Sequence, residues 1–268
     1  NFAIVGGGPT GVEMAGTLAE IARHTLQREF RNINTAKACV RLIEAGPRVL
    51  ASFPESLSDK ACRQLQRLGL EVCAAPPAPD TTGEGYRLGG RFVACRTVAW
   101  AAGVSASPLA ESLGVPLDRA GRVRVNDDLS VPGHPDIYVA GDLAALTQSN
   151  GKPVPGVAPA AKQMGAHVAQ TLAARLDGRK GKAFGYKDYG NLATIGRMAA
   201  VVDFGHLRFS GVLAWWFWLV AHVFFLIGFR NRVAVLLNWF MAYWTYQRGA
   251  RIILGRDDRP VDPPERGN

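Results

Sequence analysis

An apolar run, Phe2-Ala3-Ile4-Val5, leads directly into Gly6-Gly7-Gly8-Pro9-Thr10-Gly11 near the start of the sequence. The apolar run has the length and composition of a buried strand. The glycines fit the pattern G-x-G-x-x-G, and Pro9 suits a first helical turn because its missing N–H would be unpaired there anyway. A strand that passes through a glycine turn into a helix indicates a dinucleotide-binding βαβ unit.

Each glycine of this turn has a task in binding a pyrophosphate. Gly6 permits the tight turn, Gly8 lets the backbone approach the phosphates, and Gly11 lets the helix pack closely on the strand. The helix that starts near Thr10 offers free N–H groups and a partial positive charge. We therefore predict that Gly6, Gly8, Thr10 and Gly11 bind the cofactor.

Glu44 ends the second apolar run, where an acidic side chain accepts hydrogen bonds from both ribose hydroxyls of an adenosine. It would also repel the 2′-phosphate of NADP, so we interpret the site as one for NAD(H). Glu44 lies 33 residues after Gly11 rather than about 20, which an elongated first helix would explain. The alternative is a Gly-rich structural turn with an unrelated surface Glu.

Over residues 1 to about 120, short apolar runs alternate with helical patterns, which predicts an α/β domain with a parallel sheet covered by helices. A breaker cluster at 76–83 separates the βαβ pattern from a hairpin. The expected elements are strands at 2–5, 39–43, 70–74 and 97–101, a hairpin at 86–94, and helices from 9 to about 30 and at 54–68.

Composition excludes several classes of protein. The chain has 268 residues, of which 48% are hydrophobic, so its length and composition suit one or two folded domains. Its formal net charge is +9. The four cysteines form no C-x-x-C pair, so a disulfide framework, a zinc ribbon and a dithiol centre are disfavoured, and we expect four reduced thiols in or near strands. The five histidines have no metal-like spacing, so no metal site is expected.

Asp142 carries a second cofactor motif, because it follows the apolar run 137–140 through Gly141. Such an Asp can accept hydrogen bonds from a ribityl hydroxyl of a flavin, although it is also common at ordinary strand ends. A helix expected over 159–176 begins with small residues such as Ala160, which let a large ring lie against its N-terminus. That helix end would stabilise negative charge on a reduced flavin.

Residues 205–254 are the most unusual part of the chain. A run of 18 uncharged residues, 212–229, is followed by Arg230-Asn231-Arg232 and a second apolar run, and five of the six Trp lie here. Six Arg and no acidic residue occur between Gly205 and Arg256, which favours an anionic lipid surface over nucleic acid. We favour helices lying in one leaflet, with a spanning pair or a buried soluble core as alternatives.

Together these residues resemble the two-dinucleotide-binding flavoproteins, and within them the type II, non-proton-pumping NADH:quinone oxidoreductases. The likeness covers nearly the whole chain, and the combination of motifs is far more specific than any one of them. The segments that carry it are 6–13, 100–104, 140–142, 160–163, 189–197 and 225–232.

The resemblance implies FAD-dependent oxidation of NADH with two-electron reduction of a membrane quinone. It implies an NAD(H)-binding Rossmann domain (1–120), the C-terminal part of an FAD domain (121–204), membrane-binding helices (205–254) and a disordered tail (255–268). The resemblance places the protein on the cytoplasmic face of the inner membrane, as a peripheral or monotopic protein. Whether it forms a homodimer is left open. By similarity, the nicotinamide and flavin region involves Glu13 and Gly103, the FAD site Gly141, Asp142 and Ala160, and the quinone side Gln163 and Lys162.

One departure from the family is large: its N-terminal FAD fingerprint is absent, so we expect a fragment that carries sites without holding FAD tightly. The nearest alternatives are a disulfide reductase or a sulfide:quinone oxidoreductase of the same superfamily, both of which need a redox-active Cys pair near the flavin. A non-catalytic NAD(H)-sensing membrane adaptor is a third, and it would have no need of Asp142 or Gln163.

Overall fold

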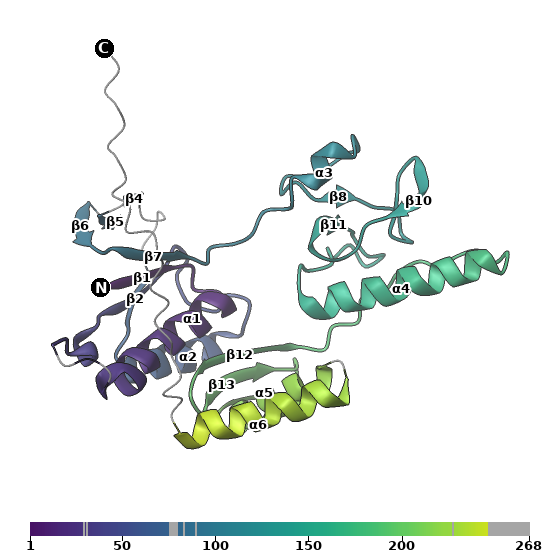
Figure 1. The fold of residues 1–268 in the computed structure, drawn as a ribbon. Coiled ribbons are helices and arrows are strands. Elements are labelled where there is room, and N and C mark those ends of the chain that lie inside the picture. The colour runs from purple at the N-terminus through teal and green to yellow at the C-terminus, as the bar shows by residue number, and fades with distance from the viewer. Residues whose placement is uncertain are drawn as a thin grey trace, which may run out of the picture.

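The computed structural model describes residues 1–28, 30, 32–74, 80–82, 84–88, 90–226 and 228–245. Figure 1 shows two lobes joined by an extended segment, with a further sheet and two helices packed on the first lobe. The predicted tail, 255–268, and the end of the predicted membrane-binding stretch lie outside the described residues.

The first lobe is built on a four-stranded parallel sheet in the order β3-β2-β1-β7, as the sequence predicted. Its strands are β1 (Phe2–Val5), β2 (Val40–Glu44), β3 (Glu71–Ala74) and β7 (Thr97–Trp100). β1 is central because it pairs with both β2 and β7, and Ile4 at its middle is fully buried. The crossover helices are α1 (Pro9–Glu20) and α2 (Glu55–Arg67).

The first helix reaches its expected length but changes its winding on the way. Regular α-helix ends at Glu20, a π-helical segment covers Ile21–Thr25, and a 3-10 turn follows over Leu26–Arg28. A second 3-10 turn, Thr35–Lys37, leads into β2. The elongated helical segment predicted from the distance between Gly11 and Glu44 is therefore present.

A small antiparallel sheet, in the order β4-β5-β6, flanks the first lobe. The predicted hairpin is confirmed as β5 (Gly85–Leu88) and β6 (Arg91–Ala94), while β4 (Asp80–Thr82) lies in the stretch predicted to be only a breaker. That part of the prediction was wrong because two β-branched threonines pair with β5 at an edge, where a short strand suffices. Buried Tyr86 packs this sheet on Ala3 and Val5.

The second lobe has a separate core. Val123 and Val131 of its short strands, together with Leu129 just before β9, pack against Met164 of the long helix α4 (Ala158–Leu176). The strand expected at 137–140 is β10, which begins and ends earlier. The other elements are α3 (Leu109–Ser112), β8 (Val123–Arg124), β9 (Ser130–Val131), β10 (His134–Tyr138), a 3-10 turn (Gly141–Leu143) and β11 (Ala144–Ala145).

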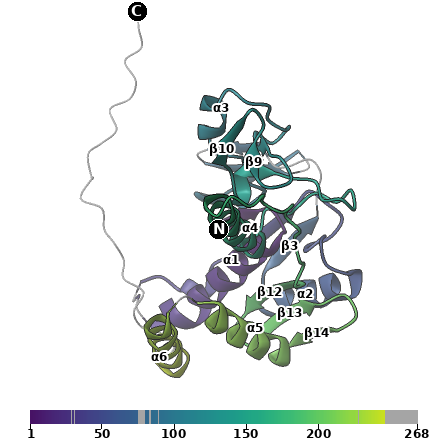
Figure 2. The same cartoon turned by 90° about the vertical axis from the view of Figure 1, so that its right-hand side faces the viewer.

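After α4 the chain returns to the first lobe and forms an antiparallel sheet, β12-β13-β14. Its strands are β12 (Asn191–Gly196), β13 (Ala199–Asp203) and β14 (Arg208–Gly211). Val201 of β13 joins the core around Ile4 and α1, whereas its neighbours Ala200 and Val202 face the other way, against α5. This period-two alternation makes the sheet a middle layer between the first lobe and α5, as Figure 2 shows.

The contact between α1 and β12 is unusually close. A Cβ added to Gly16 would lie 1.9 Å from the carbonyl oxygen of Ile195, so only glycine fits at this helix position. On the same face, Glu13 Oε1 accepts a hydrogen bond from the Thr194 N–H at 3.1 Å, and the Glu20 carboxylate accepts one from the Arg197 N–H. The free edge of β12 is thereby satisfied by side chains of α1.

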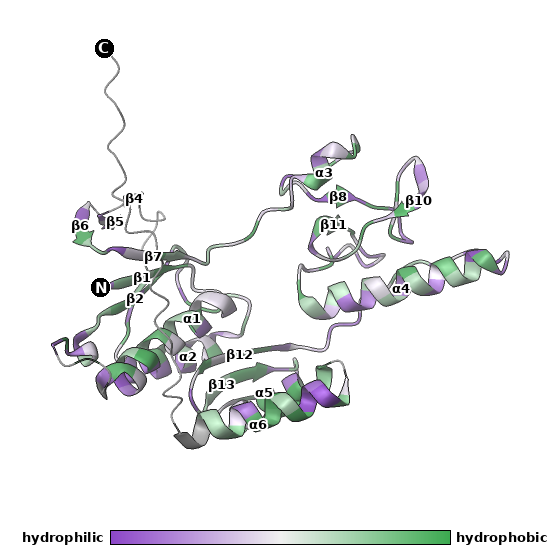
Figure 3. Ribbon diagram, viewed as in Figure 1, coloured by the Kyte–Doolittle hydropathy of each residue, from purple (hydrophilic) through white to green (hydrophobic). Residues whose placement is uncertain are grey.

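The predicted C-terminal helices are present as α5 (Val212–Phe225) and α6 (Phe229–Thr245). No helix among the described residues is long and apolar enough to cross a membrane. Only Ala214 and Trp215 of α5 are buried, against β13. Figure 3 shows that α6 begins hydrophilic and is largely apolar further on, and large apolar side chains of both helices are exposed: Val212, Leu213, Trp216, Phe217, Val220, Phe224, Phe225, Phe229, Val233, Leu236, Leu237, Phe240 and Met241.

All four cysteines are unpaired. Cys73 lies in β3, and Cys39 and Cys95 adjoin strands, as expected. Cys62 does not, because it lies within α2, where a small apolar side chain packs against the core as readily as in a strand.

Candidate functional site

The first group of predicted site residues gathers at one edge of the parallel sheet. The glycine turn follows β1, Glu44 ends β2, and Gly103 comes three residues after β7. Since these three strands are parallel neighbours, their carboxyl ends meet at the same edge. In open α/β sheets this edge is where ligands bind.

Gly6 and Gly11 are fixed by packing. Gly6 has a φ of +109°, and a Cβ there would lie 2.6 Å from the carbonyl of Ala101, while a Cβ on Gly11 would lie 1.8 Å from the oxygen of Gly6. Both glycines therefore let backbone meet backbone at the strand–helix junction, in the roles that the sequence predicted.

Gly8 and Thr10 form the open side of the turn. No atom lies within 4 Å of a Cβ built on Gly8, and Thr10 is exposed in the first turn of α1. No side chain caps this helix, and its first turn has no acidic residue. Open space beside an uncapped helix N-terminus fits a pyrophosphate.

The Glu44 carboxylate is held in place by two amides of neighbouring loops. Oε2 accepts from the Gly7 N–H at 2.5 Å, and Oε1 accepts from the Gly46 N–H at 2.7 Å. A carboxylate has about four acceptor positions, so two remain available to a ligand. The arrangement fixes an acceptor beside the glycine turn, where the ribose of a dinucleotide would lie.

The second group lies in the other lobe, around the start of α4. Gly141 has a φ of +77°, its N–H points at Met164 Sδ at 3.2 Å, and a Cβ there would touch that of Ala161. Asp142 is exposed beside this contact, and Ala160 is buried beneath it. The N-terminus of α4 has neither a capping side chain nor an acidic first turn, which fits the predicted flavin-side helix end.

Gln163 binds backbone rather than facing an open space. Its Nε2 donates to the carbonyl of Lys187 at 2.9 Å, and its Oε1 accepts from the N–H of the same residue at 3.0 Å. Lys162, one residue earlier, is exposed, and its Nζ lies 5.5 Å from the centroid of the Phe225 ring. Both residues predicted for the quinone side therefore have partners within the protein: Gln163 binds the backbone of Lys187, and Lys162 lies near the Phe225 ring.

Glu13 lies on the β12 side of α1, through its hydrogen bond to Thr194. Seven residues on, Glu20 makes the same kind of contact, and burial raises the pKa of its carboxyl even though the Arg197 N–H opposes the shift. Sequence reasoning missed Glu20 and Gly16. A glycine inside a helix, three residues after Glu13, was the available signal, because such a glycine usually marks a close approach.

The structure therefore brings the predicted residues together in two clusters rather than one. Gly6, Gly8, Thr10, Gly11, Glu44 and Gly103 form the first, and Gly141, Asp142, Ala160, Lys162 and Gln163 the second. Glu13 belongs to neither cluster. Its hydrogen bond to Thr194 lies seven residues along the chain from Lys187, the residue that Gln163 of the second cluster binds.

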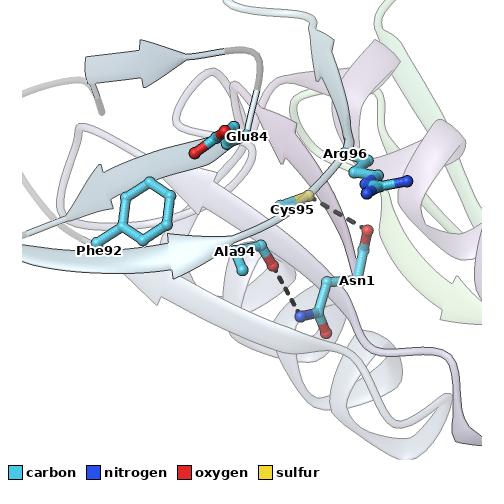
Figure 4. Close-up of a pocket in the computed structure, with 6 residues that line it drawn as sticks. All are labelled: Asn1, Glu84, Phe92, Ala94, Cys95 and Arg96. Atoms are coloured by element: carbon cyan, nitrogen blue, oxygen red, sulfur yellow. Dashed lines mark hydrogen bonds between the residues drawn. The ribbon is translucent and has the colours of Figure 1, made fainter.

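A cavity of about 460 Å³ lies elsewhere, between the chain start and the β5–β6 hairpin. Figure 4 shows its lining, in which Cys95 Sγ donates to the Asn1 carbonyl and Asn1 Nδ2 donates to Ala94. None of the predicted site residues lines it. The cavity is therefore not part of the candidate site.

Comparison with known families identifies the chain. Residues 1–165 match the family described as pyridine nucleotide-disulphide oxidoreductase. The chain belongs to this family. Residues 189–245 match the model of the NDH2 C-terminal domain, which covers β12–β14, α5 and α6, and this pair of matches confirms the predicted resemblance to type II NADH:quinone oxidoreductases.

Curated relatives point the same way. Two proteins of Mycobacterium tuberculosis, the type II NADH:quinone oxidoreductases Ndh and NdhA, are 42% and 39% identical over 92% and 94% of this chain. A type II NADH:quinone oxidoreductase of Haemophilus influenzae is 34% identical over 75%. The chain spans 55%, 56% and 46% of these relatives, so it corresponds to about half of each.

Solved structures share the fold. NDH2 of Plasmodium falciparum in complex with NADH superposes with a TM-score of 0.81 at 17% identity, covering 91% of this chain and 65% of that one. An FAD-dependent pyridine nucleotide-disulphide oxidoreductase of Desulfovibrio vulgaris superposes with a TM-score of 0.56 at 21% identity, covering 75% and 48%. At these identities the likeness supports the α/β fold alone.

Proposed function

We propose that the protein to which this chain belongs oxidises NADH and delivers two electrons to a membrane quinone, using FAD and pumping no protons. The observation that carries the proposal is the union, in one chain, of the nucleotide turn with Glu44 and an NDH2-type C-terminal module packed on the helix that this turn opens. When bound, the nicotinamide and the flavin supply the hydride and electron chemistry.

The part of this chain in that reaction is to bind and orient the reactants. The open turn at Gly8 and the N-terminus of α1 bind the pyrophosphate, and the fixed Glu44 carboxylate accepts from the adenosine ribose. Gly103, with a φ of +99° and no atom within 4 Å of its Cβ position, leaves room for the nicotinamide. Positioning of this kind accounts for much of what an enzyme adds to a cofactor.

The second cluster would hold the flavin. Gly141 lets the backbone turn sharply against α4, and Asp142, exposed at this turn, is free to accept from hydroxyls of the ribityl chain. The uncapped start of α4 would stabilise negative charge on the ring. Gln163 and Lys162 would lie on the quinone side, and Glu13 between the two clusters; Gln163 would orient the acceptor only by exchanging its bonds to Lys187.

The reaction is tested with the full-length enzyme in membrane vesicles. We expect NADH oxidation only when a quinone or an artificial acceptor such as ferricyanide is present. Absorbance at 340 nm follows NADH, and flavin bleaching under anaerobic conditions reports the first half-reaction. An enzyme that turned over a disulfide or sulfide substrate but not a quinone would contradict the proposal.

Glu44→Gln should reduce the preference for NADH over NADPH by about 5- to 100-fold, since a charged acceptor is lost together with the repulsion of a 2′-phosphate. The measurement is kcat/KM for both nucleotides with ferricyanide. Glu55→Gln, an equal charge change at the exposed start of α2, is the control and should leave the ratio unchanged. Equal use of both nucleotides by the wild type would show that Glu44 does not face the ribose.

The exposed apolar face of α5 and α6 supports attachment to a membrane surface, the finer part of the proposal. Isolated exposed apolar residues are ordinary, but a contiguous set over two adjacent helices is not. Residues 204–245 contain Arg208, Arg230 and Arg232 and no acidic residue, which suits an anionic leaflet. We place the enzyme peripherally on the cytoplasmic face of the inner membrane, with a homodimer compatible with this arrangement.

The double variant Leu237→Glu and Phe240→Glu, at two exposed positions of α6, should release the enzyme into the soluble fraction. NADH:ferricyanide activity should be retained, because neither side chain touches the nucleotide site. Sedimentation followed by immunoblotting measures the distribution. Ile33→Glu, at an exposed apolar position of the first lobe, is the control; a double variant that still sedimented with membranes as the control does would locate the anchor elsewhere.

A further inference from the structure

The turn between α5 and α6 is tied to the start of α4 by one side chain from each side. The Nζ of Lys162, in the second turn of α4, lies 5.5 Å from the centroid of the Phe225 ring, at the last position of α5. Figure 1 shows the α5–α6 turn next to the N-terminal end of α4. A cation at this distance from a ring is attracted to its electron-rich face.

Phe225 is held in place by contacts among residues at and beside the α5–α6 turn. Its ring meets that of Phe224 edge to face, with centroids 5.5 Å apart. The guanidinium of Arg232, from the first turns of α6, lies 5.7 Å from the Phe224 ring, and its Nε donates to the carbonyl of Leu226 at 3.0 Å. Arg232 therefore closes the turn, and the turn presents Phe225 to Lys162.

Lys162 is fixed from its own side as well. The next residue, Gln163, binds both backbone groups of Lys187, so this part of α4 is joined to the chain that leads into β12. Among the described residues no carboxylate is paired with Lys162, and residues 204–245 hold no Asp or Glu that could compete. An aromatic face is thus the partner that this ammonium finds at the edge of the apolar helices.

We propose that Lys162 is a positioning residue: with Phe225 it forms a latch that holds the α5–α6 turn against the flavin-side end of α4. The latch fixes the distance between the apolar helices and the helix that would face the acceptor. An apolar acceptor that approaches along α5 and α6 then meets an entrance whose two sides, the α5–α6 turn and the start of α4, keep a fixed separation. The inference rests on the proposed function only where it names the acceptor as a quinone. The contact between Lys162 and Phe225 is independent of that function.

The kinetic test uses the full-length enzyme, with a short-chain ubiquinone analogue at saturating NADH. Lys162→Met and Phe225→Leu should each raise KM for the quinone by about 2- to 10-fold, and the double variant should be no worse than the poorer single one. Lys162→Arg keeps the cation, so it should rescue the KM that Lys162→Met raises. Phe225→Leu should leave NADH:ferricyanide activity unchanged. Phe229→Leu, an exposed position beyond the turn, is the matched control and should have no effect.

A second measurement does not depend on turnover. Hydrogen exchange of the Arg232 amide, which bonds to the Gly228 carbonyl in the turn, should accelerate in Lys162→Met and Phe225→Leu and stay at the wild-type rate in Lys162→Arg and Phe229→Leu. A wild-type enzyme that reduced no quinone would overturn the proposed function, and the exchange rates would still decide on the latch.

Three results would overturn the latch. Effects of Lys162→Met and Phe225→Leu that simply add in the double variant would show that the two side chains act independently. A fall in kcat for Lys162→Met with no change for Phe225→Leu would make Lys162 act on the acceptor directly. Unchanged exchange at Arg232 in both variants would show that the contact does not hold the turn.

Discussion

The backbone of β12 meets α1 with no side chain between them, and the other elements are arranged around this contact. Gly16 permits it, because any Cβ at that position would collide with the Ile195 carbonyl. Glu13 and Glu20, one turn before and one turn after, accept the N–H groups of Thr194 and Arg197 on the strand's free edge. Close packing and hydrogen bonding thus join segments about 180 residues apart.

This contact gives the nucleotide turn and the C-terminal helices one common support. The N-terminus of α1 carries the open turn at Gly8, while its flank carries the β12–β14 sheet. The far face of that sheet, through Ala200 and Val202, packs on Trp215 of α5. Nucleotide binding and attachment to an apolar surface are therefore proposed for opposite sides of one continuous packed body.

Features set by local sequence were predictable, whereas features set by distant packing were not. The packing roles of Gly6 and Gly11 follow from a strand, a turn and a helix adjacent in sequence, and both glycines do meet backbone there; the role of Gly8 in phosphate binding stays a prediction. The partners of Glu13 and Gln163 could not be predicted, because both bind backbone of residues far along the chain. Cys62 shows the same limit: a partly buried position in α2 and one in a strand look alike in composition.

The close approach of α1 to β12 is tested by Gly16→Ala in the full-length enzyme, compared with Thr17→Ala at the neighbouring exposed position of α1. Alanine is the better helix former by about 1 kcal/mol, so an ordinary helical Gly→Ala change stabilises. We predict the opposite here: a loss of about 1–3 kcal/mol from overpacking, seen as a lower midpoint of thermal unfolding and as faster hydrogen exchange at the Thr194 amide. Thr17→Ala should leave hydrogen exchange at the Thr194 amide unchanged and should hold or slightly raise the unfolding midpoint, because alanine is a better helix former than threonine. A Gly16→Ala enzyme as stable as the wild type, or more so, would contradict the close approach of α1 to β12.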